Sequence, residues 1–99
     1  LGQTPSFSRS AQVIIQVQPV YPNSALKRNI VGFVKVDFVL DEQGRAKDIQ
    51  ILESRPEGIF ERAVLKSVNK TKYQPVIENG EVVQIRVSQG FCFKDPLCL

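Results

Sequence analysis

The chain has 99 residues, of which 42% are hydrophobic and 23% are charged, and these shares exclude an intrinsically disordered protein. The length leaves room for one domain with one modest core. The formal net charge of +3 comes from 13 basic and 10 acidic residues spread along the chain, whereas a nucleic-acid-binding protein gathers its positive charge on one face. No apolar run is long enough to cross a bilayer and no signal peptide is recognisable, so we expect any membrane anchor of the parent protein to precede Leu1.

The first part of the chain is predicted to be the end of a linker. Residues 1–10 contain Ser, Thr and Gly without a hydrophobic period, which is typical of a flexible segment. The apolar residues between Ala11 and Val17 form a short extended stretch. We therefore divide the chain into a flexible or extended linker end, residues 1–19, and one folded domain, residues 20–99.

A short helix and a strand are predicted next. Proline suits the first turn of a helix, so Pro22 predicts a short helix that runs to about Asn29 and buries Ala25 and Leu26. The clearest strand covers Phe33–Leu40, where apolar and polar residues alternate. Its apolar face holds Val34, Val36, Phe38 and Leu40, and its polar face holds Lys35 and Asp37.

The following segment predicts a β-hairpin. Residues 41–44 form a turn in which Gly44 supplies the positive φ that hairpin loops need. A second strand from Ala46 to about Glu53 is expected to bury Ile49 and Ile51. Because each strand has one apolar face, the hairpin requires a helix to cover it.

An amphipathic helix after the hairpin supplies this cover. Its apolar positions recur at helical spacing and are Phe60, Ala63, Val64, Ser67 and Val68. The basic residues Arg62, Lys66 and Lys70 lie four apart on the outer face, where a solvated helix surface is the more common explanation and contact with an acidic partner is the alternative. The helix is expected to end near Lys72.

The last segment is predicted to be one long strand. Asn79 and Gly80 are typical of a two-residue turn. Apolar residues alternate beyond this turn, at Val83, Ile85, Val87, Phe91 and Phe93. Gly90 within the strand indicates a bulge or the close approach of another group. The predicted fold is α+β, a three-stranded antiparallel sheet with two helices packed on one face.

The residues offer little for catalysis. The chain has no histidine, which removes the commonest general base, and no glycine-rich phosphate loop follows a strand. The carboxylates of the hairpin lie on its polar face or in its turn, where solvation explains them. We therefore predict no enzyme, no catalytic residue, no cofactor and no metal site.

The two cysteines, Cys92 and Cys98, lie near the C-terminus. They are too few for a zinc site in a chain without histidine. Their spacing is compatible with a disulfide in an oxidising compartment and with a pair of free thiols in the cytosol. Pro96 between them allows the tail to turn back on itself.

The edges of the predicted sheet are the remaining candidate for a binding site. An edge strand has main-chain N–H and C=O groups without a partner. Proteins either protect such an edge or use it to bind an extended peptide as an additional strand. The protected edge is the more common case on physical grounds alone.

Several motifs match one known family in the same order. They are Tyr21-Pro22, Ala25, Gly32–Phe38, Gly44-Arg45, Ile49–Leu52, Pro56, Phe60–Arg62, Tyr73-x-Pro75 and Phe91-x-Phe93. Together they resemble the TonB C-terminal domain over Tyr21–Phe93, roughly three-quarters of the chain. The fold of that family, a short helix, two strands, a helix and a last strand, agrees with the elements predicted above.

The resemblance implies a function in the periplasm. TonB proteins are energy transducers of double-membraned bacteria that are anchored in the inner membrane and work with the proton-driven ExbB–ExbD complex. Their C-terminal domain binds the TonB box of outer-membrane transporters for siderophores, haem or cobalamin by strand addition. The partner-binding residues that the resemblance implies here are Gln16, Val17, Gln18, Val83, Gln84, Ile85, Arg86, Val87, Ser88, Gln89, Gly90 and Phe91.

Two features depart from the family pattern. Thr71 stands where the family usually has an aromatic residue, often Trp, so the end of the helix must pack differently. The pair Cys92 and Cys98 is not a general family feature, although the oxidising periplasm favours a disulfide between them. A tail held by this disulfide would either shape the binding edge or cover it.

Two other functions are compatible with the same predicted elements. A periplasmic scaffold similar to the C-terminal domain of TolA would bind other proteins without recognising a TonB box. A cystatin-like inhibitor is more remote, because the sequence has no Gln-x-Val-x-Gly loop. Self-association of the domain is left open, and nucleic acid is not an expected partner.

Overall fold

The structure, a computed structural model, describes residues 9, 10 and 12–98 of the chain. In chain order the elements are β1 (Arg9–Ser10), β2 (Val13–Ile15), α1 (Asn23–Lys27), β3 (Gly32–Leu40), β4 (Ala46–Arg55), α2 (Glu61–Lys70), β5 (Lys72–Tyr73), β6 (Val76–Glu78), β7 (Glu81–Val83), β8 (Ile85–Phe93) and the 3₁₀ helix η2 (Pro96–Cys98). Across these residues, neither α-helix has the length and apolar character needed to cross a membrane.

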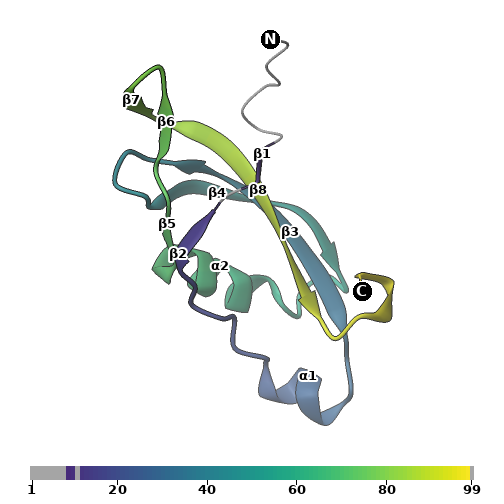
Figure 1. The fold of residues 1–99 in the computed structure, drawn as a ribbon. Helices are drawn as coiled ribbons and strands as arrows, with labels where there is room; N and C mark the ends of the chain where they lie inside the picture. The colour runs from purple at the N-terminus through teal and green to yellow at the C-terminus, as the bar shows by residue number, and fades with distance from the viewer. Residues whose placement is uncertain (1–8, 11, 99) are drawn as a thin grey trace.

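The main sheet is built around β3. This strand pairs with β4 on one side and with β8 on the other, both antiparallel, and β1 adds to the outer side of β8 in parallel orientation. Two small sheets, β2 with β5 and β6 with β7, accompany it. Figure 1 shows α1 and α2 on the same side of the main sheet. The predicted α+β fold, with three antiparallel strands and two helices on one face, is therefore confirmed, and β1 extends the sheet by a short fourth strand.

The core lies between the main sheet and the helices. Alternate residues of β3 are fully buried, as predicted: Val34, Val36, Phe38 and Leu40. The side of α2 that faces them contributes Val64, Ser67 and Val68, while Arg62, Lys66 and Lys70 are exposed on its outer side. Phe60 stacks on Phe93 with 4.2 Å between the ring centroids, and Tyr73 is buried beside Phe38 at 5.1 Å.

Two side chains predicted to be buried are exposed. Leu26 is 49% exposed, because α1 has only 5 residues and presents Ala25 alone to the core. Ile51 is 37% exposed because β4 is an edge strand of the sheet, and a register shift next to it leaves Leu52 51% exposed as well. Ile49 packs partly buried against the core, as predicted.

The prediction of one long final strand is wrong at its start. The turn at Asn79 and Gly80 is confirmed, and both residues have positive φ, 54° and 81°. This turn, however, joins β6 to β7, so Val83 belongs to a separate small hairpin and β8 begins only at Ile85. In Figure 1 the β6–β7 hairpin projects beyond the end of the main sheet.

Gly90 occupies a regular position in β8. It pairs with Lys35 of β3 without a register shift, so the predicted bulge is absent from this strand pair. A Cβ atom at this position would lie 3.0 Å from the ring of Phe33. The structure therefore supports the second alternative: glycine stands here because another group approaches closely.

The turn between β3 and β4 is fixed by one carboxylate. Asp41 Oδ1 accepts hydrogen bonds from the main-chain N–H groups of Gln43 and Arg45, both at 2.9 Å. The hydrogen bond from Arg45 is the largest cause that holds the pKa of Asp41 below its usual value of 3.8. Gly44 follows in this turn with a φ of +82°, as the hairpin prediction required.

Candidate functional site

A hollow of about 360 Å³ lies between the end of β8 and the extended segment that precedes α1. Its lining residues are Gln16, Gln18, Pro19, Tyr21, Gln89, Gly90, Phe91, Cys92, Phe93 and Lys94. We call this hollow the edge groove. It brings together two segments that are more than 60 positions apart in the sequence.

The edge groove contains some of the predicted partner-binding residues and not others. Gln16, Gln18, Gln89, Gly90 and Phe91 line it. Ile85, Arg86, Val87 and Ser88 lie further back along β8, Val83 and Gln84 lie outside that strand, and Val17 contributes to the support of the groove wall. The groove also contains Tyr21, Cys92, Phe93 and Lys94, which the sequence did not predict as partner-binding residues, although Cys92 was named as a disulfide candidate and Tyr21 and Phe93 were part of the motifs that carried the resemblance.

The groove wall is held by the hydroxyl group of Thr71. This oxygen accepts hydrogen bonds from Val17 N at 3.1 Å and from Gln16 Nε2 at 3.2 Å, and it donates to Ser67 O at 2.8 Å. One hydroxyl group has one hydrogen and two acceptor sites, so these three bonds use its whole capacity. Ser67 Oγ donates a further hydrogen bond to Val17 O. Where the family usually has an aromatic ring, this chain therefore has a polar anchor for the extended segment.

Replacing Thr71 with Val is expected to destabilise the domain by about 1–3 kcal/mol, because the half-buried Val17 N–H loses its acceptor. Thr71→Ser keeps the hydroxyl group and is expected to cost less than about 1 kcal/mol. Urea denaturation of both variants measures the difference. A smaller loss in Thr71→Val than in Thr71→Ser would mean that Thr71 acts through packing of its methyl group, which only the serine variant lacks, and not through the hydrogen bonds.

Tyr73 positions a second side chain in the groove. Its hydroxyl group donates to Gln89 Oε1 at 2.8 Å. Burial raises the pKa of Tyr73 to about 12, so the phenol keeps its proton at any physiological pH and remains a donor. Gln89 is thereby held beside the groove by a buried residue of β5.

Packed aromatic rings hold the two walls of the groove together. Tyr21 meets both Phe60 and Phe93 edge to face, with ring centroids 5.5 and 5.6 Å apart. Its hydroxyl group donates to Ile30 O, and Phe93 O lies 3.4 Å away. The ammonium group of Lys94 lies 5.6 Å from the centre of the Tyr21 ring. Tyr21 thus ties the extended segment to the end of β8.

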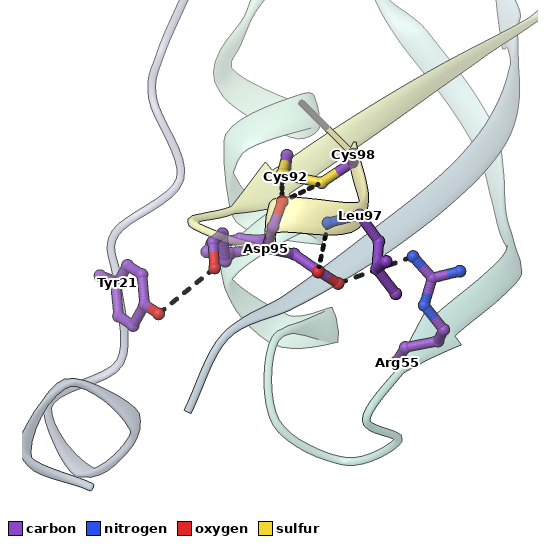
Figure 2. The surroundings of a disulfide bond; sticks show 7 residues. Tyr21, Arg55, Cys92, Asp95, Leu97 and Cys98 are labelled. Carbon is purple, nitrogen blue, oxygen red and sulfur yellow. Dashed lines mark hydrogen bonds and ion pairs between the residues drawn. A yellow bond between two sulfur atoms is a disulfide. The ribbon is translucent and has the colours of Figure 1, made fainter. Parts of the chain in front are cut away.

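The C-terminal tail shapes the far end of the groove. Cys92 and Cys98 form a disulfide, with Cα atoms 6.3 Å apart, and Figure 2 shows how it folds the tail back over Asp95. Asp95 Oδ1 accepts a hydrogen bond from Leu97 N at 2.9 Å, and Oδ2 lies 3.7 Å from Arg55 Nη2. Both sulfur atoms lie close to Asp95 O, at 3.4 and 3.3 Å, but a disulfide sulfur has no hydrogen to donate, so these are contacts only. No residue of η2 lines the groove, so in the part of the chain that the structure describes the tail borders the groove and leaves it open.

The outer edge of β8 has an occupied part and an open part. β1 pairs with it at Val87 and Ser88. From Gln89 to Phe93, no other described strand pairs with this side of β8. The open part of the edge coincides with the edge groove. Within the described ranges there is also no group of three or more His, Cys, Asp or Glu side chains that is arranged to hold a metal ion.

The arrangement defines a class of protein: a small α+β domain whose candidate binding site is a groove beside a sheet edge. A family model described as Gram-negative bacterial TonB protein C-terminal matches residues 17–94. The chain belongs to this family of TonB C-terminal domains.

Individual relatives agree with the family match. The chain is 41% identical over 76 residues to protein TonB of Pseudomonas aeruginosa, covering 77% of this chain and 22% of that protein. It is 35% identical over 86 residues to protein TonB of Vibrio cholerae, covering 87% of this chain and 35% of that protein. The solution NMR structure of the Pseudomonas aeruginosa TonB C-terminal domain superimposes with a TM-score of 0.73 at 36% identity, covering 88% of each chain. The chain therefore spans well under half the length of these two TonB proteins.

Proposed function

We propose that this chain is the periplasmic, C-terminal part of a TonB-type energy transducer and that it binds the TonB box of outer-membrane transporters by strand addition to β8. The observation that carries the proposal is the open edge from Gln89 to Phe93, which faces the segment Gln16–Tyr21 across the edge groove. The pairing of β1 supports it, because the same side of β8 accepts a strand from its own chain.

Main-chain hydrogen bonds would supply most of the attraction for the added strand. The residues that line the groove suit such a strand, since they include the amide residues Gln16, Gln18 and Gln89 and the aromatic residues Tyr21 and Phe91. Such a site tolerates many sequences, and a domain that pulls on a transporter must also release it. We therefore expect a dissociation constant in the micromolar range, which corresponds to about −8 kcal/mol.

The other functions of the full-length protein belong to the same proposal. An N-terminal helix upstream of this chain anchors the protein in the inner membrane and connects it to the ExbB–ExbD complex. Proton-motive energy then reaches the transporters, which take up siderophores, haem or cobalamin. The domain contributes recognition and mechanical attachment and catalyses no reaction.

The test is an NMR titration of the isotope-labelled domain with a TonB-box peptide and with a series of peptides that carry one N-methyl group each. Amide shifts should concentrate between Gln89 and Lys94 and in Gln16–Tyr21. In a strand only alternate residues direct their N–H toward a given neighbour. N-methylation should therefore weaken binding about tenfold or more at every second position and change it little at the positions between, because a methyl group removes the donor and obstructs the ladder.

The peptide series leaves the domain itself unchanged, so folding defects cannot explain a loss of binding. A pattern without a period of two would contradict strand addition even if the peptide binds. No binding at millimolar peptide would contradict TonB-box recognition and would favour a scaffold function of the TolA type. Shifts confined to the outer side of α2 would place the site on another surface.

A further inference from the structure

We propose that β1 is an intramolecular competitor: Arg9–Ser10 covers part of the β8 edge, and a long partner strand must displace it. The inference rests on the strand addition proposed above and concerns the regulation of the same edge. Its basis is the parallel pairing of Arg9 with Val87 and of Ser10 with Ser88. These contacts occupy main-chain positions directly before the open part of the edge.

A short tether keeps β1 close to β8. Gln12 is fixed to the domain, since its main-chain O accepts a hydrogen bond from Gln74 N at 2.8 Å. Beyond it, Val13 pairs with Tyr73 in the small sheet of β2 and β5. Only one residue therefore separates Ser10 from an anchored position. A segment on so short a tether has a millimolar effective concentration at its own site, so β1 rebinds rapidly after each opening.

The competition depends on the length of the partner strand. A strand advances by about 3.3 Å per residue, so the open part of the edge from Gln89 to Phe93 accommodates about five residues, or about 16 Å. A partner of that length does not meet β1. A partner that pairs with the whole of β8, which has 9 residues, needs the positions at Val87 and Ser88 that β1 covers. β1 therefore weakens the binding of long partner strands or slows their full pairing with β8.

The experiment compares two double variants of the complete chain. Arg9→Pro with Ser10→Pro removes both main-chain N–H groups of β1, whereas Arg9→Ala with Ser10→Ala keeps them. Both variants lose the same two side chains, so the charge change is matched. Thermal melting should show one cooperative transition for both variants, with the proline variant slightly lower, because the β1–β8 pairing that competes with the peptide also stabilises the folded chain. Amide hydrogen exchange of Val87 and Ser88 is measured first without any ligand.

Affinities are then measured for a nine-residue TonB-box peptide and for its central five residues. We expect faster exchange in the proline variant at whichever of Val87 and Ser88 directs its N–H toward β1. We also expect this variant to bind the nine-residue peptide about three- to tenfold more tightly than the alanine variant, because the covered fraction of the edge is released. The five-residue peptide should bind both variants equally.

Two results would overturn the competitor function. Equal exchange rates in the two variants would show that β1 does not cover the edge. Equal affinities for the nine-residue peptide would show that covering the edge has no effect on binding. If neither peptide binds any variant, the strand-addition function fails, and the exchange comparison still decides whether β1 covers β8.

Discussion

Replacing Phe60 with Ala is expected to lower the free energy of unfolding by about 3–5 kcal/mol. Phe60 is fully buried, and its ring contacts both Phe93 and Tyr21. Truncation therefore leaves a cavity at the point where α2, β8 and the extended segment meet. A domain of this size has a total stability of only about 5–15 kcal/mol, so the variant is expected to be partly unfolded at 37 °C.

The matched control is Phe33→Ala. Phe33 is only half-buried and lies under the guanidinium group of Arg55 at 5.0 Å, so its removal should cost less than about 2 kcal/mol. Urea denaturation followed by circular dichroism measures both variants. A loss below about 1 kcal/mol for Phe60→Ala, or one no larger than that of the control, would contradict the placement of this ring at the centre of the core.

Gly44→Ala is expected to destabilise the domain by about 2–5 kcal/mol, for two additive reasons. The φ of +82° strains any residue with a side chain, and a Cβ atom here would lie 2.2 Å from the main-chain O of Tyr73. Tyr73 N also donates a hydrogen bond to Gly44 O at 2.9 Å, so the two main-chain segments are in direct contact. β5 would therefore have to move to make room for the Cβ atom. Because Tyr73 orients Gln89, we also expect the edge groove to lose its shape.

The control variant Gly80→Ala separates backbone strain from the steric contact with Tyr73. Gly80 has nearly the same φ, +81°, but an added Cβ atom would meet nothing within 4 Å. The loss of stability in Gly80→Ala should therefore come from backbone strain alone and amount to about 1 kcal/mol. If thermal unfolding gives equal losses for Gly44→Ala and Gly80→Ala, the contact between the β3–β4 turn and β5 is unimportant for stability.

Most of the fold follows from local patterns in the sequence. The alternation in Phe33–Leu40 and the helical spacing from Phe60 to Val68 predicted the correct buried faces, because both elements contribute one whole face to the same core. The errors lie at its margins, where burial depends on what covers a residue. Ile51 is on the correct side of its strand, but β4 is an edge strand and the register shift beside it cannot be inferred from the alternation of residues.

The candidate site was predictable in part. Gln89–Phe91 and Gln16–Gln18 were named from the family resemblance, and the structure brings them to one groove. Residues 83–84 were assigned to the last strand because the apolar alternation continues through Val83, whereas the turn at Asn79 and Gly80 uses Val83 to close a separate hairpin. The anchoring by Thr71 and the covering by β1 depend on contacts between residues more than 50 positions apart, which no local pattern encodes.

The long pairing of β8 with β3 determines how the domain responds to force. A strand attached along β8 and drawn lengthwise loads all its hydrogen bonds together, in shear, so they resist as a group and fail as a group. β8 is joined to β3 by 9 residue pairs, whereas the open edge between Gln89 and Phe93 is shorter. If the domain binds its partner by strand addition as proposed, the attached strand should slip off under rising tension before the sheet of the domain yields, and the domain should remain folded for the next attachment.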